Sequence, residues 1–258
     1  MKKIAAIFTL LPAIAIAPHL ASAQASSCPA NTVEISREVV TNGDEQTTRL
    51  HCRRIDRLTP NELSNLGAGA LANLSPEDRK RVDFLRGLQS TNMRDRDQPL
   101  DAPITNDVGD RSAYNYFKVI EQFQVEKSPR YAEDSETYCN IFAEDVTRAM
   151  NAPLPQMVVN DMVDWLKENR ATSGWKRVDE RMAQQMAKEG HPSIAIAANV
   201  TPSNHGHVAV IRPASEGDNR GAAITQAGAS NIDATHIEYL PAFSDPAQLQ
   251  PIQYWYHE

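Results

Sequence analysis

The chain has 258 residues, of which 41% are hydrophobic and 23% are charged, and its formal net charge is -7. This composition is typical of a globular protein with one large or two small domains, and it excludes a wholly disordered chain. Lysine and arginine occur only in short runs. A nucleic-acid partner, which requires a basic stripe along the phosphate backbone, is therefore not expected.

The N-terminus has the layout of a secretory signal peptide. Lys2-Lys3 form a basic start, an apolar stretch runs from Ile4 to Ala17, and Ala21-Ser22-Ala23 is an A-x-A cleavage site. The apolar stretch is shorter than the roughly 20 residues that span a bilayer. We therefore predict that residues 1–23 are a signal peptide cleaved after Ala23. The mature protein should have no transmembrane segment and a secreted or periplasmic location.

The chain has three cysteines, and outside the cytoplasm cysteines tend to form disulfides. Cys28 and Cys52 flank two alternating segments that surround Asn42-Gly43, a pattern typical of a β-hairpin with a two-residue turn. A turn at Asn42-Gly43 would place Val33 opposite Cys52. We predict a Cys28–Cys52 disulfide, which leaves Cys139 free for chemistry.

Two helices are predicted after the hairpin from their first residues. Thr59-Pro60-Asn61-Glu62 and Ser75-Pro76-Glu77-Asp78 each offer a hydroxyl cap, a proline at the first helical position and an acid that can reach back to the cap. Leucines extend the first helix to Leu71 and the second to Leu88. Residues 24–88 are thus predicted to form an N-terminal hairpin plus two helices, and the polar segment 89–110 a linker.

Residues 111–258 contain the candidate chemistry. Apolar residues recur at helical spacing after Cys139, which places this cysteine in the first turn of a buried helix. Asp134, Ser135 and Thr137 are the candidate N-cap residues. The free N–H groups and the positive dipole end of a first turn favour a thiolate, and the same N–H groups can stabilise an oxyanion.

Two further helices and several short strands are predicted after the Cys139 helix. The helices cover 161–169, capped by Asn160, and 179–189. Short β-rich runs separated by Gly, Pro and Asn predict strands at 194–197, 208–211, 223–225, 237–239 and 254–256. Helices followed by strands indicate an α+β fold in which an antiparallel sheet packs on the Cys139 helix.

His207 stands at the start of one predicted strand, in Gly206-His207-Val208-Ala209-Val210-Ile211. An imidazole is a suitable base for a thiol near neutral pH and can form a thiolate–imidazolium pair with it. A single Cys and a single His are more often structural than catalytic, so their order and context decide the interpretation.

Four segments together resemble the CHAP and NlpC-type papain-like cysteine amidases and peptidases. They lie within residues 130–245 and are Cys139-Asn140-Ile141-Phe142-Ala143-Glu144-Asp145-Val146, Ala152-Pro153-Leu154-Pro155, the Gly206–Ile211 segment, and Thr225-Gln226-Ala227-Gly228. The resemblance implies a papain-like core with Cys139 as nucleophile and His207 as general base and acid. It also implies cleavage of an amide bond in the peptide part of bacterial cell-wall peptidoglycan.

The resemblance further implies a third polar group that orients the imidazole, and here the sequence departs from common forms of the family. CHAP members often have Glu or Asn there, and NlpC types His, Asn or Gln. We assign the role to Gln226, in the strand after His207, with Asn231 as the alternative. A neutral amide stabilises the imidazolium less than a carboxylate would, which predicts a slower or more alkaline enzyme. The upstream oxyanion donor is not placed, because Glu133 stands where papain's spacing would put a glutamine.

His205-Gly206-His207, taken together with Cys139, could also suggest a zinc site. A structural zinc site needs four protein ligands and a catalytic one three, and no second cysteine or acid lies at ligand spacing. We therefore expect no metal and no cofactor, and we expect His205 to be a loop residue at the rim of the cleft.

The leading hypothesis is an exported peptidoglycan hydrolase, either an amidase or a stem-peptide endopeptidase, that acts through an acyl-enzyme on Cys139. Two alternatives stay open: a thiol-dependent acyl transferase, and a non-catalytic wall-binding protein on the same scaffold. The N-terminal region would bind the wall, bind a protein inhibitor or immunity partner, or cover the cleft.

Overall fold

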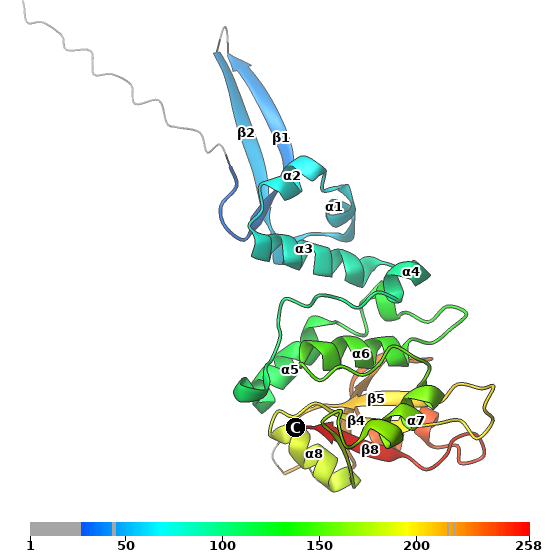
Figure 1. Cartoon of the computed structure of the whole chain (residues 1–258). Coiled ribbons are helices and arrows are strands. Elements are labelled where there is room, and N and C mark those ends of the chain that lie inside the picture. The colour runs from blue at the N-terminus through cyan, green and yellow to red at the C-terminus, as the bar shows by residue number, and fades with distance from the viewer. Residues whose placement is uncertain (1–26, 43–44, 216, 219) are drawn as a thin grey trace, which may run out of the picture.

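The computed structural model describes residues 27–42, 45–215, 217–218 and 220–258, and the predicted signal peptide lies outside them. The molecule is elongated: a two-stranded hairpin projects at one end, and a six-stranded sheet with its helices forms the other (Figure 1). Helices α3 (Pro76–Gln89) and α4 (Met93–Arg96) lie between the two ends. Among the described residues, no helix is both long and apolar enough to cross a membrane.

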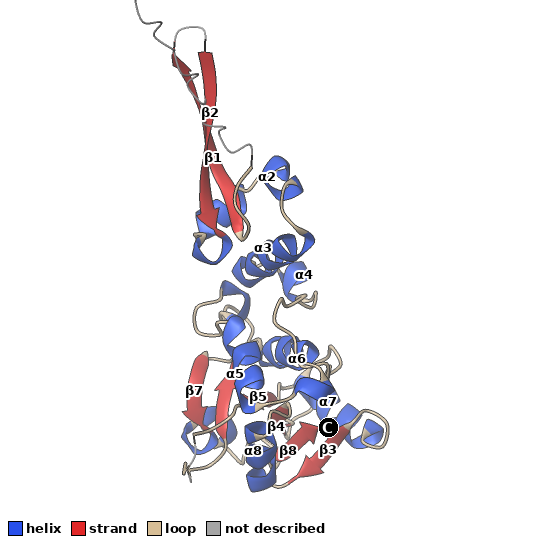
Figure 2. Ribbon diagram, turned by 90° about the vertical axis from the view of Figure 1, so that its left-hand side faces the viewer, coloured by secondary structure: helices blue, strands red, loops and turns tan. Residues whose placement is uncertain are grey.

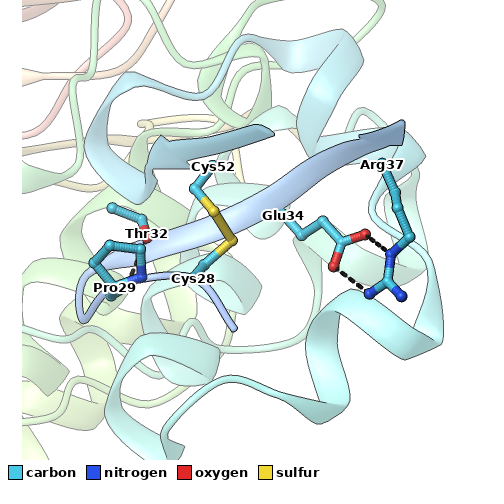
Figure 3. The surroundings of a disulfide bond; sticks show 6 residues. All are labelled: Cys28, Pro29, Thr32, Glu34, Arg37 and Cys52. Carbon is cyan, nitrogen blue, oxygen red and sulfur yellow. Dashed lines mark hydrogen bonds and ion pairs between the residues drawn. A yellow bond between two sulfur atoms is a disulfide. The ribbon is translucent and has the colours of Figure 1, made fainter. Parts of the chain in front are cut away.

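The N-terminal hairpin consists of β1 (Thr32–Asn42) and β2 (Glu45–Arg54), which pair antiparallel. The predicted disulfide between Cys28 and Cys52 is confirmed, and it ties the chain that enters β1 to β2 (Figure 3). The predicted register is wrong, because Cys52 lies opposite Glu34 and not Val33. Two features cause the difference: the pairing extends to Asn42, a residue of the predicted turn, and the register shifts at a bulge after Glu34.

Two short helices, α1 (Pro60–Asn65) and α2 (Ala68–Ala72), replace the single first helix predicted through Leu71. Leu66 and Gly67 adopt extended backbone conformations between them, which interrupts the predicted helix. Thr59 caps α1 in the predicted capping box with Glu62. These helices, α3 and the base of the hairpin enclose a small core of their own, made of Val33, Ile55, Leu63, Leu66 and Val82.

The N-terminus of α3 differs in one detail from the predicted cap. Ser75 accepts a hydrogen bond from the Asp78 N–H, as expected, but its hydroxyl also donates to the Asp78 carboxylate. Further along the helix, Phe84 and Leu88 belong to the larger C-terminal core. One helix therefore contributes side chains to both hydrophobic cores.

Segment 89–110, the predicted linker, packs against the C-terminal part of the protein. Its Arg96 is buried and donates hydrogen bonds to the Asp134 carboxylate at 2.7 Å and to the Pro129 and Ala132 carbonyl oxygens. The guanidinium also lies 3.9 Å from the centroid of the Tyr138 ring. The segment thus holds the chain that leads directly into the Cys139 helix.

The C-terminal part contains a six-stranded sheet of order β3-β8-β4-β5-β6-β7, in which every pair is antiparallel. Its strands are β3 (Trp175–Val178), β4 (Ser193–Ala197), β5 (His207–Ile211), β6 (Ala223–Gln226), β7 (Ile232–His236) and β8 (Gln253–His257). The central strands β4 and β5 are buried at every position, which explains their continuous apolar sequences. The predicted α+β class with an antiparallel sheet is confirmed.

Four longer helices pack around this sheet (Figure 2). They are α5 (Ala113–Gln122), α6 (Cys139–Ala149), α7 (Val159–Asn169) and α8 (Glu180–Lys188). Helix α6, which begins at Cys139, lies against β5 and β6, whereas α7 and α8 contact β4. The predicted packing of the cysteine helix on the sheet is therefore present.

Two strand predictions need correction. Residues predicted as a strand at 237–239 form the 3-10 helix Ile237–Tyr239, and the strand beside β6 is β7 instead. The β-like pattern at Ile237 reflects its burial rather than strand pairing. Strand β3 was not predicted, because it is a four-residue edge strand whose Lys176 and Arg177 are exposed, so the apolar run of a central strand is missing.

The N-caps of the C-terminal helices were predicted with mixed success. Asp179, predicted as the first residue of its helix, is instead the N-cap of α8. None of the candidates upstream of Cys139 caps α6, because the helix begins at Cys139 and its N-cap position belongs to Tyr138, which makes no side-chain cap. The Asp134 carboxylate instead accepts hydrogen bonds from Arg96 and the Tyr138 hydroxyl. Asn160 does not cap α7 either, since the helix already begins at Val159.

A buried ion pair fixes α6 to the chain before it. Arg130 and Asp145 are each 1% exposed at their side chains and approach to 2.8 Å. The Asp145 carboxylate also accepts hydrogen bonds from the Tyr131 hydroxyl and the Leu100 N–H. Arg130 donates in addition to the carbonyl oxygens of three residues of segment 89–110: Asp95, Arg96 and Gln98. Charge-assisted hydrogen bonds of this pair therefore join segment 89–110, the chain at Arg130 and helix α6.

The buried pair predicts a large effect of a single truncation. Asp145→Ala leaves the Arg130 charge buried without its partner, and we expect a loss of about 3–5 kcal/mol in the free energy of unfolding. Asp164→Ala, which breaks the exposed pair with Lys167, should cost less than about 1 kcal/mol. Urea unfolding of both variants measures the difference. Equal, small losses would contradict the role assigned to the buried pair.

Candidate active site

Cys139 is the first residue of α6, and its side chain is buried, with 4% of the residue exposed. Within the described residues it is the free cysteine. The backbone N–H groups of Asn140, next in the helix, and of Val208, on β5, both act on its sulfur and lower the pKa of the thiol. The nucleophile candidate therefore lies at the positive end of a helix, against the strand that carries the histidine.

His207 begins β5, where it pairs with Ala197 of the central strand β4. Its ring is buried and close enough to the Cys139 sulfur for the two groups to shift each other's pKa. Its Nε2 lies 2.5 Å from Oε1 of Gln226, at the end of β6. Since Nε2 faces Gln226, Nδ1 is the ring nitrogen left to meet the thiol.

The orientation of the Gln226 amide follows from its second hydrogen bond. Its Nε2 donates to the Ser230 carbonyl oxygen at 3.0 Å, so its Oε1 is the atom directed at the imidazole. An amide oxygen can only accept a hydrogen bond, and His207 must therefore carry a proton on Nε2. This assignment leaves Nδ1 as the atom that takes and returns the proton of the thiol.

Asn231, the alternative third residue, does not reach the imidazole. Its Oδ1 accepts a hydrogen bond from the Gly228 N–H, and its Nδ2 donates to the Tyr131 carbonyl oxygen. It thereby shapes the turn between β6 and β7 and ties this turn to the chain before α6. The structure thus brings together three of the predicted site residues, Cys139, His207 and Gln226.

The electrostatics of the pair favour charge separation. Burial raises the pKa of the Cys139 thiol, but the hydrogen bond with His207, the charge of its ring and the N–H groups of Val208 and Asn140 outweigh burial, so the pKa lies below its ordinary value. Burial likewise lowers the pKa of His207, but the Cys139 sulfur and the Gln226 amide raise it above its ordinary value. A lowered thiol pKa beside a raised imidazole pKa is the condition for a thiolate–imidazolium pair.

A pocket of about 240 Å³ opens beside the sulfur. The residues that line it come from α4, the start of α6 and the start of α7, and include Met93, Cys139 and Val158. His205 and Gly206, from the loop before His207, complete the wall. His205 therefore lies at the rim of the cleft, as the sequence predicted.

The rim does not form a metal site in the described residues, where no three His, Cys, Asp or Glu side chains gather as ligands. His205 instead approaches the Glu136 carboxylate, with Nε2 3.8 Å from Oε2, and both side chains are largely exposed. Glu133, the residue at the position of papain's oxyanion donor, is absent from the pocket lining. The N–H groups at the start of α6 remain the donors available to an oxyanion.

Two side-chain contacts around the site were not predicted from the sequence. Phe243 packs edge-on against the His207 ring, with ring centroids 4.9 Å apart, and shields it on the side of the 3-10 helix Pro241–Phe243. Asn160 reaches from α7 to the loop that precedes His207. Neither contact has a local sequence signal, because each joins segments more than 30 residues apart.

Comparison with known proteins adds no family assignment. No protein-family model matches the sequence, and a search of curated proteins found no match. The papain-like relationship therefore stays a prediction, which rests on the sequence resemblance and on the side-chain geometry described above.

The hydrogen bond from His207 to Gln226 predicts a shift in pH dependence. Gln226 contributes to the raised pKa of His207, so Gln226→Ala should lower this pKa, and the imidazolium should be lost at a lower pH. The alkaline limit of the thiolate–imidazolium pair then moves toward neutral pH. An NMR titration of the His207 ring measures the shift.

Gln226→Glu is the matched control, because a carboxylate at the same position stabilises the imidazolium more than an amide does. Its effect on the pKa of His207 should have the opposite sign to that of Gln226→Ala. Identical His207 titration curves in the two variants would contradict the contact.

Proposed function

We propose that this protein is an exported cysteine hydrolase that cleaves an amide bond in bacterial cell-wall peptidoglycan. The observation that carries the proposal is the alignment of Cys139, His207 and Gln226, in which the imidazole contacts the sulfur on one side and the amide oxygen on the other. Three residues from α6, β5 and β6 thereby form the geometry of a nucleophile, a base and an orienting group.

The chemistry follows from this arrangement. The Cys139 thiolate attacks the amide carbonyl carbon, and the N–H groups at the start of α6 stabilise the resulting oxyanion. The His207 imidazolium gives its Nδ1 proton to the leaving amine, which breaks the C–N bond and leaves a thioester. Imidazole then takes a proton from water, whose oxygen attacks the thioester, and the free acid and the thiolate are released.

The choice of peptidoglycan as substrate is supported by the sequence. The resemblance to CHAP and NlpC-type enzymes and the predicted signal peptide both favour it, and the Cys28–Cys52 disulfide fits an oxidising compartment outside the cytoplasm. An exported enzyme of this chemistry meets the peptide cross-links of the wall as its nearest polymeric amide substrate. The protein would thus act in the periplasm or outside the cell.

Purified sacculi provide the direct test of this proposal. The wild-type protein should release fragments whose new termini identify the cleaved bond by mass spectrometry. A new amine on L-alanine indicates an amidase, and one within the stem peptide indicates an endopeptidase. Cys139→Ser, which keeps the shape of the side chain but not its acidity, should reduce the rate by at least about a thousandfold.

The same experiment distinguishes the two alternatives. A transferase would pass the acyl group to an added amine, so the acceptor would appear in the products. A non-catalytic wall-binding protein would sediment with sacculi and release nothing. Equal digestion by wild type and Cys139→Ser would contradict a cysteine mechanism altogether.

The charge of the pocket indicates what kind of group lies beside the scissile bond. Asp97 and Glu136 line it, and none of its described lining residues is Lys or Arg. Met93 and Val158 add exposed apolar surface. Such a pocket attracts a peptide that carries a free ammonium group next to an aliphatic stem, as peptide cross-links between diamino acids do.

Neutralising the two carboxylates tests this preference. The double variant Asp97→Asn/Glu136→Gln should lower kcat/KM about fivefold for a peptide with a free amine, since exposed charge pairs contribute up to about 1 kcal/mol. The same peptide with its amine acetylated should be cleaved equally by wild type and variant. Steady-state kinetics at low ionic strength measures both, and an equal loss on both peptides would argue against charge recognition.

A further inference from the structure

We infer that Asn160 is a positioning residue of the active site: it holds the loop between β4 and β5 so that His207 stays in contact with Cys139. The inference rests on the proposed function, because it assigns a role within the same thiol–imidazole site. It is carried by the hydrogen bonds of one side chain to three points of a single loop.

Asn160 uses both ends of its amide on the loop 198–206. Its Nδ2 donates to the Asn204 carbonyl oxygen at 2.8 Å and to the Pro202 carbonyl oxygen at 3.3 Å. Its Oδ1 accepts a hydrogen bond from the Asn199 N–H at 2.8 Å. The side chain thus connects the beginning of the loop with its end, two residues before Gly206.

Asn199 continues the clamp to the residues next to the histidine. Its Nδ2 donates to the His205 carbonyl oxygen at 3.2 Å, and its Oδ1 accepts a hydrogen bond from the Thr201 N–H. Asn160 and Asn199 together therefore determine the direction in which the chain enters β5. His207 is the first residue of that strand.

The fit between Asn160 and the loop is close. A Cβ on Gly206 would lie 2.9 Å from Asn160 Oδ1 and 2.4 Å from the Ala197 carbonyl oxygen. Glycine is therefore required where the loop passes between α7 and β4. The loop 198–206 therefore packs closely against α7 and β4, and the hydrogen bonds of the Asn160 amide restrict its movement.

Asn160 also connects the histidine loop to the substrate pocket. The two residues before it, Val158 and Val159, line the pocket beside Cys139. At the start of α7, Val158 and Val159 therefore form a wall of the pocket, and the next residue, Asn160, holds the loop. A displacement of that wall is transmitted to His207 through the Asn160 amide.

The pH dependence of Cys139 alkylation by iodoacetamide tests the inference without requiring turnover. In the wild type the thiol should react with a midpoint well below that of an ordinary cysteine. In Asn160→Ala the loop loses three hydrogen bonds, and the midpoint should rise by about one pH unit as His207 leaves the sulfur more often. Cleavage should fall about tenfold in kcat, with KM changed less than about twofold.

Two further variants separate positioning from general damage. Asn160→Asp keeps the acceptor for the Asn199 N–H but replaces the donor to two carbonyl oxygens with a carboxylate, so it should shift the alkylation midpoint as Asn160→Ala does. Asn169→Ala removes an asparagine of the same helix whose Nδ2 donates only to the Trp165 carbonyl oxygen within α7, and it should leave the midpoint unchanged. Thermal melting confirms that each variant is folded, and if Asn160→Ala is not, Asn160→Asp decides.

The outcomes distinguish this inference from the proposed function. A wild-type thiol with an ordinary alkylation midpoint would overturn the thiolate–imidazolium pair, and with it the proposed function. A wild-type thiol with a low midpoint that persists in folded Asn160→Asp would overturn the role of Asn160 alone.

Discussion

The buried pair of Arg130 and Asp145 is the interaction on which the rest of the site depends. Charges this deep are costly to desolvate, and they are retained only where hydrogen bonds satisfy their remaining donors and acceptors. Here the pair is completed by the Tyr131 hydroxyl and by backbone groups of segment 89–110. It fixes α6 relative to the chain on either side of the pocket. The position of Cys139 is set by these contacts, because no side chain caps the helix start.

Burial also makes charge costly for the thiol–imidazole pair, which needs partners that offset this cost. Burial opposes both charges, and each group shifts the pKa of the other toward its charged form, with help from the Val208 and Asn140 N–H groups for Cys139 and from Gln226 for His207. Gln226 supplies a neutral acceptor where a carboxylate would supply a charge, so the imidazolium is held in orientation more than it is stabilised. Phe243 packs edge-on against one side of the His207 ring. The charge separation proposed for this site would therefore depend on how well His207 is kept in place.

Local patterns predicted the parts of this site that depend on local physics. A first-turn cysteine, a histidine at the start of an apolar strand and a glutamine in the next strand can each be recognised from a short stretch of sequence. The same is true of the hairpin with its disulfide. The preference for Gln226 over Asn231 as the residue that orients the imidazole also followed from the position of Gln226 within a predicted strand. The caps before Cys139 were predicted wrongly. The carboxylate of one candidate, Asp134, instead accepts a hydrogen bond from Arg96, which is 38 residues away in the sequence. Edge strand β3 escaped because its exposed residues carry no apolar signal.

Asn160 shows why contacts in the surroundings of the site could not be predicted from the sequence. Its sequence position before a helical pattern favours an N-cap, yet the helix begins one residue earlier. The amide instead bonds to a residue 44 positions further along the chain and holds a loop. A polar side chain such as that of asparagine can form several different local hydrogen bonds. Tertiary contacts, which a short stretch of sequence does not contain, decide which of them forms. The core strands β4 and β5 can stay intact while the loop between them loosens, because the loop is held by side-chain amides and the strands by their own pairing. The geometry of the Cys139–His207 site and the global stability should therefore be separable in this fold, because a change in the loop 198–206 can alter the first without altering the second.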